Sequence, residues 1–295
     1  MFTTLITPAD LVTLLERAEP CVVVDCRFKL TAPEAGLAAY REGHLPRAVY
    51  ADLDRDLSGP PATDRGRHPL PAPETLVALF GRLGIVPGMQ VVGYDDMGGM
   101  MAARLWWMLR YVGHTAVAVL DGAFTRWVAE GRPIETTERT PVATVFTGTA
   151  DRARLVTLDE VPGLAGLVDA REAPRYRGEV EPIDPRPGHI PGARNHPWPT
   201  NLRADGCFKS PAELQEAFQA SLGTLPDGAT VHYCGSGVSA CHNVLAQVHA
   251  GLAEPRLYCG SWSEWCSDPA RPAAHGDEGR LPGAPDGPAK SGNEP

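Results

Sequence analysis

The apolar positions of the chain form short continuous runs that alternate with stretches of helical period. The runs that predict buried strands are 21–25, 91–94, 166–169 and 230–233. The stretches 73–80 and 102–109 have helical spacing, and after the last strand Ala240, Val244, Leu245 and Val248 fall on one helical face. Strands that alternate with helices indicate an α/β fold around a mainly parallel sheet.

Several motifs occur twice along the chain, in the same order. Asp25 and Asp169 each end an apolar run and stand two residues before an arginine, 144 residues apart, and His44 and His189 lie in matching Gly-His-x-Pro turns, 145 residues apart. Two further pairs are 91–95 with 230–234 and 121–127 with 259–265. Four motifs in one order predict two tandem copies of one fold.

The composition between and after the copies gives the domain boundaries. The N-terminal domain is expected at 5–131 and the C-terminal domain at 152–272. The stretch 132–151, rich in Thr, Pro and Arg, predicts a linker. Residues 273–295 are dominated by Pro, Gly, Ala and charge, which predicts a disordered tail.

The overall charge and the cysteine count exclude several classes of protein. The chain has 295 residues and a net charge of −9, which disfavours nucleic acid or an anionic membrane surface as partner. It has no apolar run near the roughly 18 residues of a membrane span, and its first residues lack the features of a signal peptide, so we expect a cytoplasmic protein. Seven cysteines without a Cys-x-x-Cys pair suggest neither a disulfide framework nor a zinc site, and we expect no cofactor.

Cys234 lies in a sequence context that is typical of a reactive cysteine. Cys234 follows the predicted strand 230–233 and precedes a predicted helix, so it lies on the connecting turn. Gly235 and Gly237 permit a tight loop whose backbone N–H groups point inward, and the helix adds the positive end of its dipole. Such a loop favours a thiolate, a persulfide or a bound anion. The first copy has Asp95 at this position and no thiol in its loop, so the C-terminal copy is predicted to be catalytic and the N-terminal copy inactive.

These motifs together resemble the tandem-domain rhodanese-family sulfurtransferases, over about residues 5–272. The resemblance implies two rhodanese-like domains, each a mainly parallel sheet flanked by helices. It implies a ping-pong cycle in which a small anionic donor gives a sulfane sulfur to Cys234, and the persulfide passes it to a thiol, cyanide or a carrier protein. The loop 234–238 is similar to that of 3-mercaptopyruvate sulfurtransferases, whereas members that use thiosulfate usually have basic residues directly after the cysteine.

The resemblance also implies substrate-binding residues. Arg175, in the segment 173–178, matches the family's substrate arginine, and its planar fork suits a carboxylate. The second arginine of mercaptopyruvate enzymes lies nine residues further, where this chain has Asp184. Arg186 could take the role from a shifted register, with Arg177 as the alternative. The backbone of the loop, through Gly235, Gly237, Val238 and Ser239, is expected to cradle the anion.

The resemblance further implies proton handling by Ser236, supported by His68 and Asp54. Asp52 and Asp64 stay open as alternatives to Asp54. The two turn histidines, His44 and His189, occur once in each copy, which favours a structural role in holding the turn.

Other classes of function can be weighed on the same residues. A cysteine phosphatase needs Cys-x5-Arg, but the sixth residue after Cys234 is Ala240. A non-catalytic scaffold would be natural if the cysteine had been lost. A thiosulfate sulfurtransferase is the main rival. Cys241 could resolve an oxidised Cys234, although a buried packing role is favoured.

Overall fold

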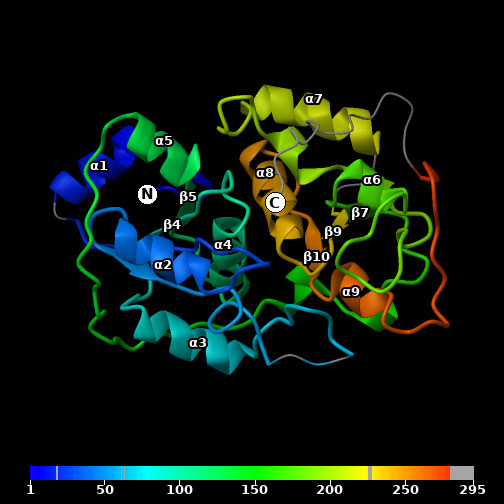
Figure 1. Cartoon of the computed structure of the whole chain (residues 1–295), viewed down its shortest axis with the longest axis horizontal. Coiled ribbons are helices and arrows are strands. Elements are labelled where there is room, and N and C mark those ends of the chain that lie inside the picture. Colours follow the sequence, from blue (N-terminus) through cyan, green and yellow to red (C-terminus); the bar gives the residue numbers. More distant parts are fainter. Residues whose placement is uncertain (18, 61, 63, 225–227, 280–295) are drawn as a thin grey trace. The chain divides into compact units, whose positions relative to one another are not determined.

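The protein consists of two compact domains, each built around its own sheet (Figure 1). The structure is a computed structural model that describes residues 1–17, 19–60, 62, 64–224 and 228–279. The N-terminal domain comprises Met1–Pro61, His68–Arg154 and Ala204–Phe208, and the C-terminal domain comprises Ala62–Arg67, Leu155–Arg203 and Lys209–Pro295. Each domain thus includes a short segment from the other half of the sequence. One of these segments brings Arg67 into the C-terminal domain.

The N-terminal domain has a five-stranded parallel sheet in the order β1-β5-β4-β2-β3. The strands are β1 (Leu5–Ile6), β2 (Cys21–Asp25), β3 (Ala48–Tyr50), β4 (Gln90–Tyr94) and β5 (Val117–Leu120). The helices are α1 (Pro8–Glu16), α2 (Ala35–Glu42), α3 (Pro73–Arg82), α4 (Ala102–Tyr111) and α5 (Ala123–Ala129). The strands and helices expected at 21–25, 91–94, 73–80 and 102–109 are therefore confirmed.

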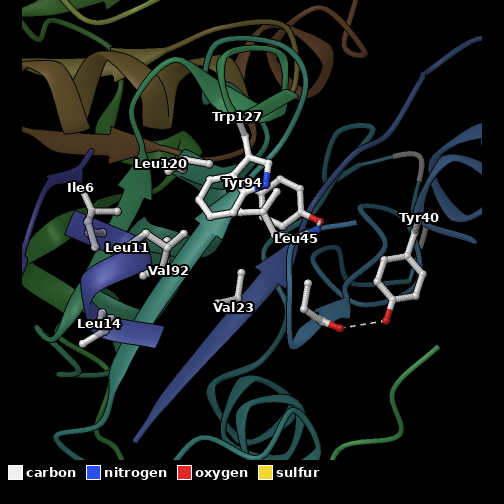
Figure 2. Packing of buried hydrophobic residues seen from close by; sticks show 12 residues of the cluster. Ile6, Leu11, Leu14, Val23, Tyr40, Leu45, Val92, Tyr94, Leu120 and Trp127 are labelled. Atoms are coloured by element: carbon white, nitrogen blue, oxygen red, sulfur yellow. Dashed lines mark hydrogen bonds between the residues drawn. The ribbon is translucent and has the colours of Figure 1, made fainter. Parts of the chain in front are cut away.

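One face of this sheet packs against α1, α2 and α5 in an apolar cluster (Figure 2). Val92 and Tyr94 of β4 lie on this face together with Leu11 of α1 and Trp127 of α5. The opposite face is covered by α4, because a Cβ on Gly93 would lie 3.4 Å from side-chain atoms of Ala102 and Leu105. Burial of such side chains on both faces gives the domain its stabilising core.

The C-terminal domain repeats this plan with the strand order β6-β10-β9-β7-β8. Its strands are β6 (Leu155–Val156), β7 (Leu167–Asp169), β8 (Arg194–Asn195), β9 (Val231–Tyr233) and β10 (Arg256–Tyr258). Its helices are α6 (Ala173–Tyr176), α7 (Pro211–Leu222), α8 (Ser239–His249) and α9 (Ser261–Trp265), with 3₁₀ turns at Leu158–Glu160 and Trp198–Asn201. Since each sheet has the same order of equivalent strands, the predicted duplication is confirmed.

The repeated motifs build the same contacts in both domains. Arg27 bonds Asp25 and the carbonyl of Gly43, just as Arg171 bonds Asp169 and the carbonyl of Gly188. The turn histidines also match. His44 Nδ1 lies 2.7 Å from the carbonyl oxygen of Tyr40, and His189 Nδ1 lies 2.8 Å from that of Tyr176, each with its ring stacked on the tyrosine. These contacts give the histidines the structural role expected for them.

The structure describes the whole stretch expected as a linker and the first part of the expected tail. The stretch 132–151 has no regular helix or strand among its residues, all of which are described. Within the stretch expected as a tail, Ala274 is buried and exchanges backbone hydrogen bonds with His189, and the N–H of Gly276 donates to the carbonyl of Arg177, so the chain contacts the C-terminal domain at these positions. The rest of the expected tail, 280–295, lies outside the described residues. Along the part of the chain that the structure describes, no helix is long and apolar enough to span a bilayer.

Candidate active site

Cys234 lies directly after β9 and ahead of α8, on the turn that the sequence predicts. Its side chain is buried, and its Sγ accepts a hydrogen bond of 3.1 Å from the backbone N–H of Gly237. A backbone donor held at this distance stabilises negative charge on the sulfur, whether thiolate or persulfide. The loop therefore presents a nucleophile together with a donor for its anionic form.

Gly237 adopts a backbone conformation that only glycine takes without strain. Its φ is +76°, and a Cβ at this position would lie 2.3 Å from the carbonyl oxygen of Cys259. The position of the N–H that donates to Cys234 Sγ therefore requires glycine for two reasons: the backbone is left-handed there, and the loop at Cys259 leaves no space for a Cβ.

A second loop, at the start of α9, fixes the cysteine loop. The N–H of Trp262 donates to the carbonyl of Cys234, and the N–H of Ser263 donates to that of Gly235, each at 2.9 Å. Ser261 Oγ accepts a hydrogen bond from the N–H of Cys234. The backbone of Ser261 has a positive φ of 57°, a conformation that costs free energy in residues other than glycine. Ala123 has a φ of 58° at the matching place in the N-terminal domain. The repeated motif at 121–127 and 259–265 is therefore a brace for the loop that follows the central strand.

The equivalent loop of the N-terminal domain is occupied by its own carboxylate. Asp95 is fully buried, and its side chain accepts the backbone N–H groups of Met97, Gly99, Met101 and Ala102 at 2.7–2.9 Å. Burial raises the pKa of Asp95, although the four donors act in the opposite direction. The loop that follows β4 is thus an anion cradle whose anion is part of the chain. Its counterpart after β9 has sulfur at that position.

Two arginines of the C-terminal domain flank the cysteine loop. A Cβ built on Gly235 would lie 3.2 Å from Nη2 of Arg67 and 3.6 Å from Nη1 of Arg175. Arg175, expected from the resemblance, comes from α6, and Arg67 comes from the segment Ala62–Arg67, where the N–H of Arg67 donates to Ser263 Oγ. Two guanidinium groups thus lie beside the residue that follows the cysteine, and such groups can bind a small anion.

The two guanidinium groups are joined by acidic side chains from one short turn. Asp184 accepts Arg67 Nη1 at 2.6 Å and Arg175 Nη2 at 3.1 Å, and Glu181 accepts Arg175 Nη2 at 2.6 Å. Glu181 also accepts the backbone N–H of Asp184, which fixes the turn. The position at which the resemblance implies an arginine thus holds a carboxylate that clamps two arginines.

Arg186 and Arg177, the two candidates for a second substrate arginine, are used elsewhere. Arg186 donates from both terminal nitrogens to the backbone carbonyls of Asp268 and Arg271. Arg177 forms an ion pair of 2.6 Å with Glu179. Arg67 is the arginine that, together with Arg175, lies beside Gly235. No sequence motif indicates Arg67, because 117 residues separate it from Asp184.

The structure selects among the acids considered for His68. His68 Nε2 lies 3.3 Å from Asp54 Oδ1, within the N-terminal domain. Asp52 instead accepts the backbone N–H groups of Asp54 and Arg55, and Asp64 belongs to the C-terminal domain. Burial and the neighbouring Asp52 raise the pKa of the Asp54 carboxyl. The expected pair of His68 and Asp54 is therefore present, and its role with Ser236 stays a prediction.

The roles expected for the remaining residues of the loop stay predictions. Ser236 and Val238 are buried, and Ser239 begins α8. Cys241 Sγ lies 3.2 Å from the carbonyl oxygen of Gly237 in the core, which fits the packing role favoured for it. Within the described residues, no group of three or more His, Cys, Asp or Glu side chains is arranged to hold a metal ion.

The chain is similar to known proteins over most of its length. The family model for the rhodanese-like domain matches residues 7–130 and 153–268. A probable 3-mercaptopyruvate sulfurtransferase of Pseudomonas aeruginosa is 47% identical over 264 residues, covering 87% of this chain and 93% of that protein. A putative thiosulfate sulfurtransferase of Mycobacterium tuberculosis is 40% identical over 278 residues, covering 92% and 97%. The solved structure of 3-mercaptopyruvate sulfurtransferase from Leishmania major is similar with a TM-score of 0.80 at 34% identity, covering 89% of this chain and 74% of that one.

Proposed function

Because the chain belongs to the rhodanese family of sulfurtransferases, we propose that it moves a sulfane sulfur from 3-mercaptopyruvate to a thiol, cyanide or a carrier protein. The observation that supports this most directly is the hydrogen bond from Gly237 N–H to Cys234 Sγ, beside Arg67 and Arg175. It combines a nucleophile, a donor for its negative charge and two cations for the donor substrate.

The proposed first step is attack of the Cys234 thiolate on the sulfur of 3-mercaptopyruvate. An S–S bond forms and the C–S bond breaks, and its electron pair leaves on the carbon as the enolate of pyruvate, which then takes a proton. The thiolate thereby becomes a persulfide, to which the N–H of Gly237 remains a donor. The carboxylate of the substrate pairs with the guanidinium groups of Arg67 and Arg175.

The proposed second step regenerates the thiolate. A thiolate or cyanide attacks the outer sulfur of the persulfide, the S–S bond breaks, and its electron pair returns to Cys234 Sγ. We assign proton transfer in the first step to the Ser236 hydroxyl, with His68 and Asp54 as its supporting pair; the resemblance and the contact between His68 and Asp54 support this assignment.

Thiosulfate is the alternative donor, and it is named for some of the relatives. The loop itself favours 3-mercaptopyruvate, because Gly235 and Ser236 stand where a basic residue would follow the cysteine. Without such a residue, the cations come only from outside the loop.

Steady-state rates with 3-mercaptopyruvate and with thiosulfate, measured for the wild type and for Cys234→Ser, test the proposal. We expect the wild type to prefer 3-mercaptopyruvate and the variant to lose at least about 10³-fold in kcat, because the serine hydroxyl cannot carry the sulfur. Wild type that transfers sulfur from neither donor would contradict the function, and a serine variant that keeps its activity would contradict the assignment of Cys234.

A further inference from the structure

The charged side chains behind the cysteine loop form one continuous chain of ion pairs in the C-terminal domain. From the core outward it runs Asp169, Arg171, Glu181, Arg175, Asp184, Arg67. Its links are 2.6–3.2 Å long. The side chains at the core end are almost fully buried, and the last two arginines are about one-fifth exposed. The chain of pairs therefore leads from the sheet to Gly235.

The core end of this chain is rigidly fixed. Arg171 bonds Asp169 through two nitrogens and the carbonyl of Gly188 through one of them. Burial alone would lower the pKa of Arg171, but the charge and hydrogen bonds of Asp169 outweigh it and raise the pKa. Glu181 joins this fixed arginine to Arg175, so the position of Arg175 is set from the core.

The outer end differs, because Asp184 is shared by the two arginines that face the loop. One carboxylate oxygen takes Arg67 and the other takes Arg175, and the side chain of Asp184 is only 2% exposed. Each arginine thus turns one edge toward Asp184 and keeps another terminal nitrogen near Gly235. This chain of ion pairs contains three acids and three arginines. The positive charge of the arginines beside the loop is therefore balanced by carboxylates before any donor binds.

We propose that Asp184 is a specificity-determining residue that makes this site select a donor with one negative charge over a donor with two. The proposal rests on the proposed sulfur transfer. 3-Mercaptopyruvate presents one carboxylate, which two arginines partly neutralised by Asp184 can bind. Thiosulfate brings two charges in a smaller volume, so it gains more from uncompensated cations and suffers more from a carboxylate nearby.

The same carboxylate also orients the two guanidinium groups, and the two roles predict different results. Loss of orientation lowers the rates with both donors alike. Removal of one negative charge adds an interaction that a dianion feels about twice as strongly as a monoanion, because the Coulomb energy scales with charge. The ratio of kcat/KM for thiosulfate to that for 3-mercaptopyruvate therefore isolates the charge effect.

The test measures this ratio with cyanide as acceptor, so that both donors yield thiocyanate. For Asp184→Asn, which keeps the shape and removes the charge, we expect the ratio to rise about tenfold over the wild type. The matched control is Glu179→Gln, which removes the same charge from an acid that pairs with Arg177. In this control we expect the ratio to stay within about twofold, since the charge is more exposed and screened by solvent.

Arg67→Gln provides a second measurement that does not depend on the folding of the first variant. Loss of this cation is expected to lower the ratio about tenfold, in the direction opposite to Asp184→Asn. An unchanged ratio in Asp184→Asn with lower rates for both donors would overturn the proposal and leave Asp184 a structural residue. If Asp184→Asn does not fold, an unchanged ratio in Arg67→Gln overturns it. Wild type inactive with both donors would refute the proposed function itself, and the proposal with it.

Discussion

Substitution of Gly237 by alanine should damage the cysteine loop more than its backbone angle alone explains. At φ +76° an alanine is strained by about 1–2 kcal/mol relative to glycine. Its Cβ would also lie 2.3 Å from the carbonyl oxygen of Cys259, so one of the two loops has to move. Overpacking of this kind costs about 1–3 kcal/mol. We therefore expect Gly237→Ala to lower the free energy of unfolding by about 2–5 kcal/mol.

The chain offers a closely matched control in Gly251, after the end of α8. Gly251 has the same φ of +76°, but a Cβ there would have no heavy atom within 4 Å. Gly251→Ala should therefore show the strain alone, about 1–2 kcal/mol, and leave the sulfur-transfer rate unchanged. Gly237→Ala should also lose about 10-fold or more in kcat/KM, because its N–H is the donor to Cys234 Sγ.

Urea unfolding of both variants and initial rates with 3-mercaptopyruvate measure these effects. Equal losses of stability in the two variants would show that the contact with Cys259 adds nothing. Full activity in Gly237→Ala would refute the role given to the Gly237 N–H, since the loop cannot keep its position against Cys259 with a Cβ in place.

Three further predictions concern chemistry, recognition and pH. Ser236→Ala should lower kcat with 3-mercaptopyruvate by about 10²-fold and spare thiosulfate, and equal losses with both donors would contradict a role in proton transfer. Arg175→Gln should lower kcat/KM about 10- to 100-fold through loss of charge-assisted hydrogen bonds, whereas Arg186→Gln should act on thermal stability and hardly on KM; the reverse pattern in KM would restore Arg186 as the substrate arginine. Burial lowers the pKa of His232 from its ordinary 6.5 to about 4 in the folded protein. Between about pH 6.5 and 4 the unfolded state therefore binds a proton that the folded state does not, so the free energy of unfolding should fall as the pH drops through this range. Urea midpoints across this range check the last prediction, and His232→Gln should weaken the dependence.

The fold could be predicted from the sequence because its signals are local and occur twice. The apolar runs at 21–25 and 91–94 become β2 and β4, and the duplication confirms each element through its counterpart in the other domain. The place of Cys234 also follows from local chemistry, since the glycines at 235 and 237 permit a tight loop after the strand.

The site residues that the sequence missed are held by contacts between distant segments. Arg67 reaches Asp184 across 117 residues, and no spacing rule relates them. Arg186 is near the expected position in sequence, but its guanidinium group donates to the backbone carbonyls of Asp268 and Arg271. Similarly, the sequence offers three acids close together as partners for His68, and the folded structure shows that Asp54 is the one whose carboxylate contacts its ring.

The loops that carry Asp95 and Cys234 have equivalent positions in the two domains but differ in how their backbone N–H groups are used. In the N-terminal domain four backbone N–H groups donate to the carboxylate of Asp95, so the donors of this loop are already bound by a side chain of the protein. A sulfur that must accept and release another atom cannot be enclosed in that way. At Cys234 one N–H reaches the sulfur. The N–H groups of Trp262 and Ser263 hold the loop through its backbone carbonyls, as the N–H of Phe124 holds the carbonyl of Asp95 in the N-terminal domain. The brace is thus common to both loops, and the difference between them is that four backbone donors bind the Asp95 carboxylate whereas one binds the Cys234 sulfur. This difference supports the proposal that the C-terminal domain alone is catalytic.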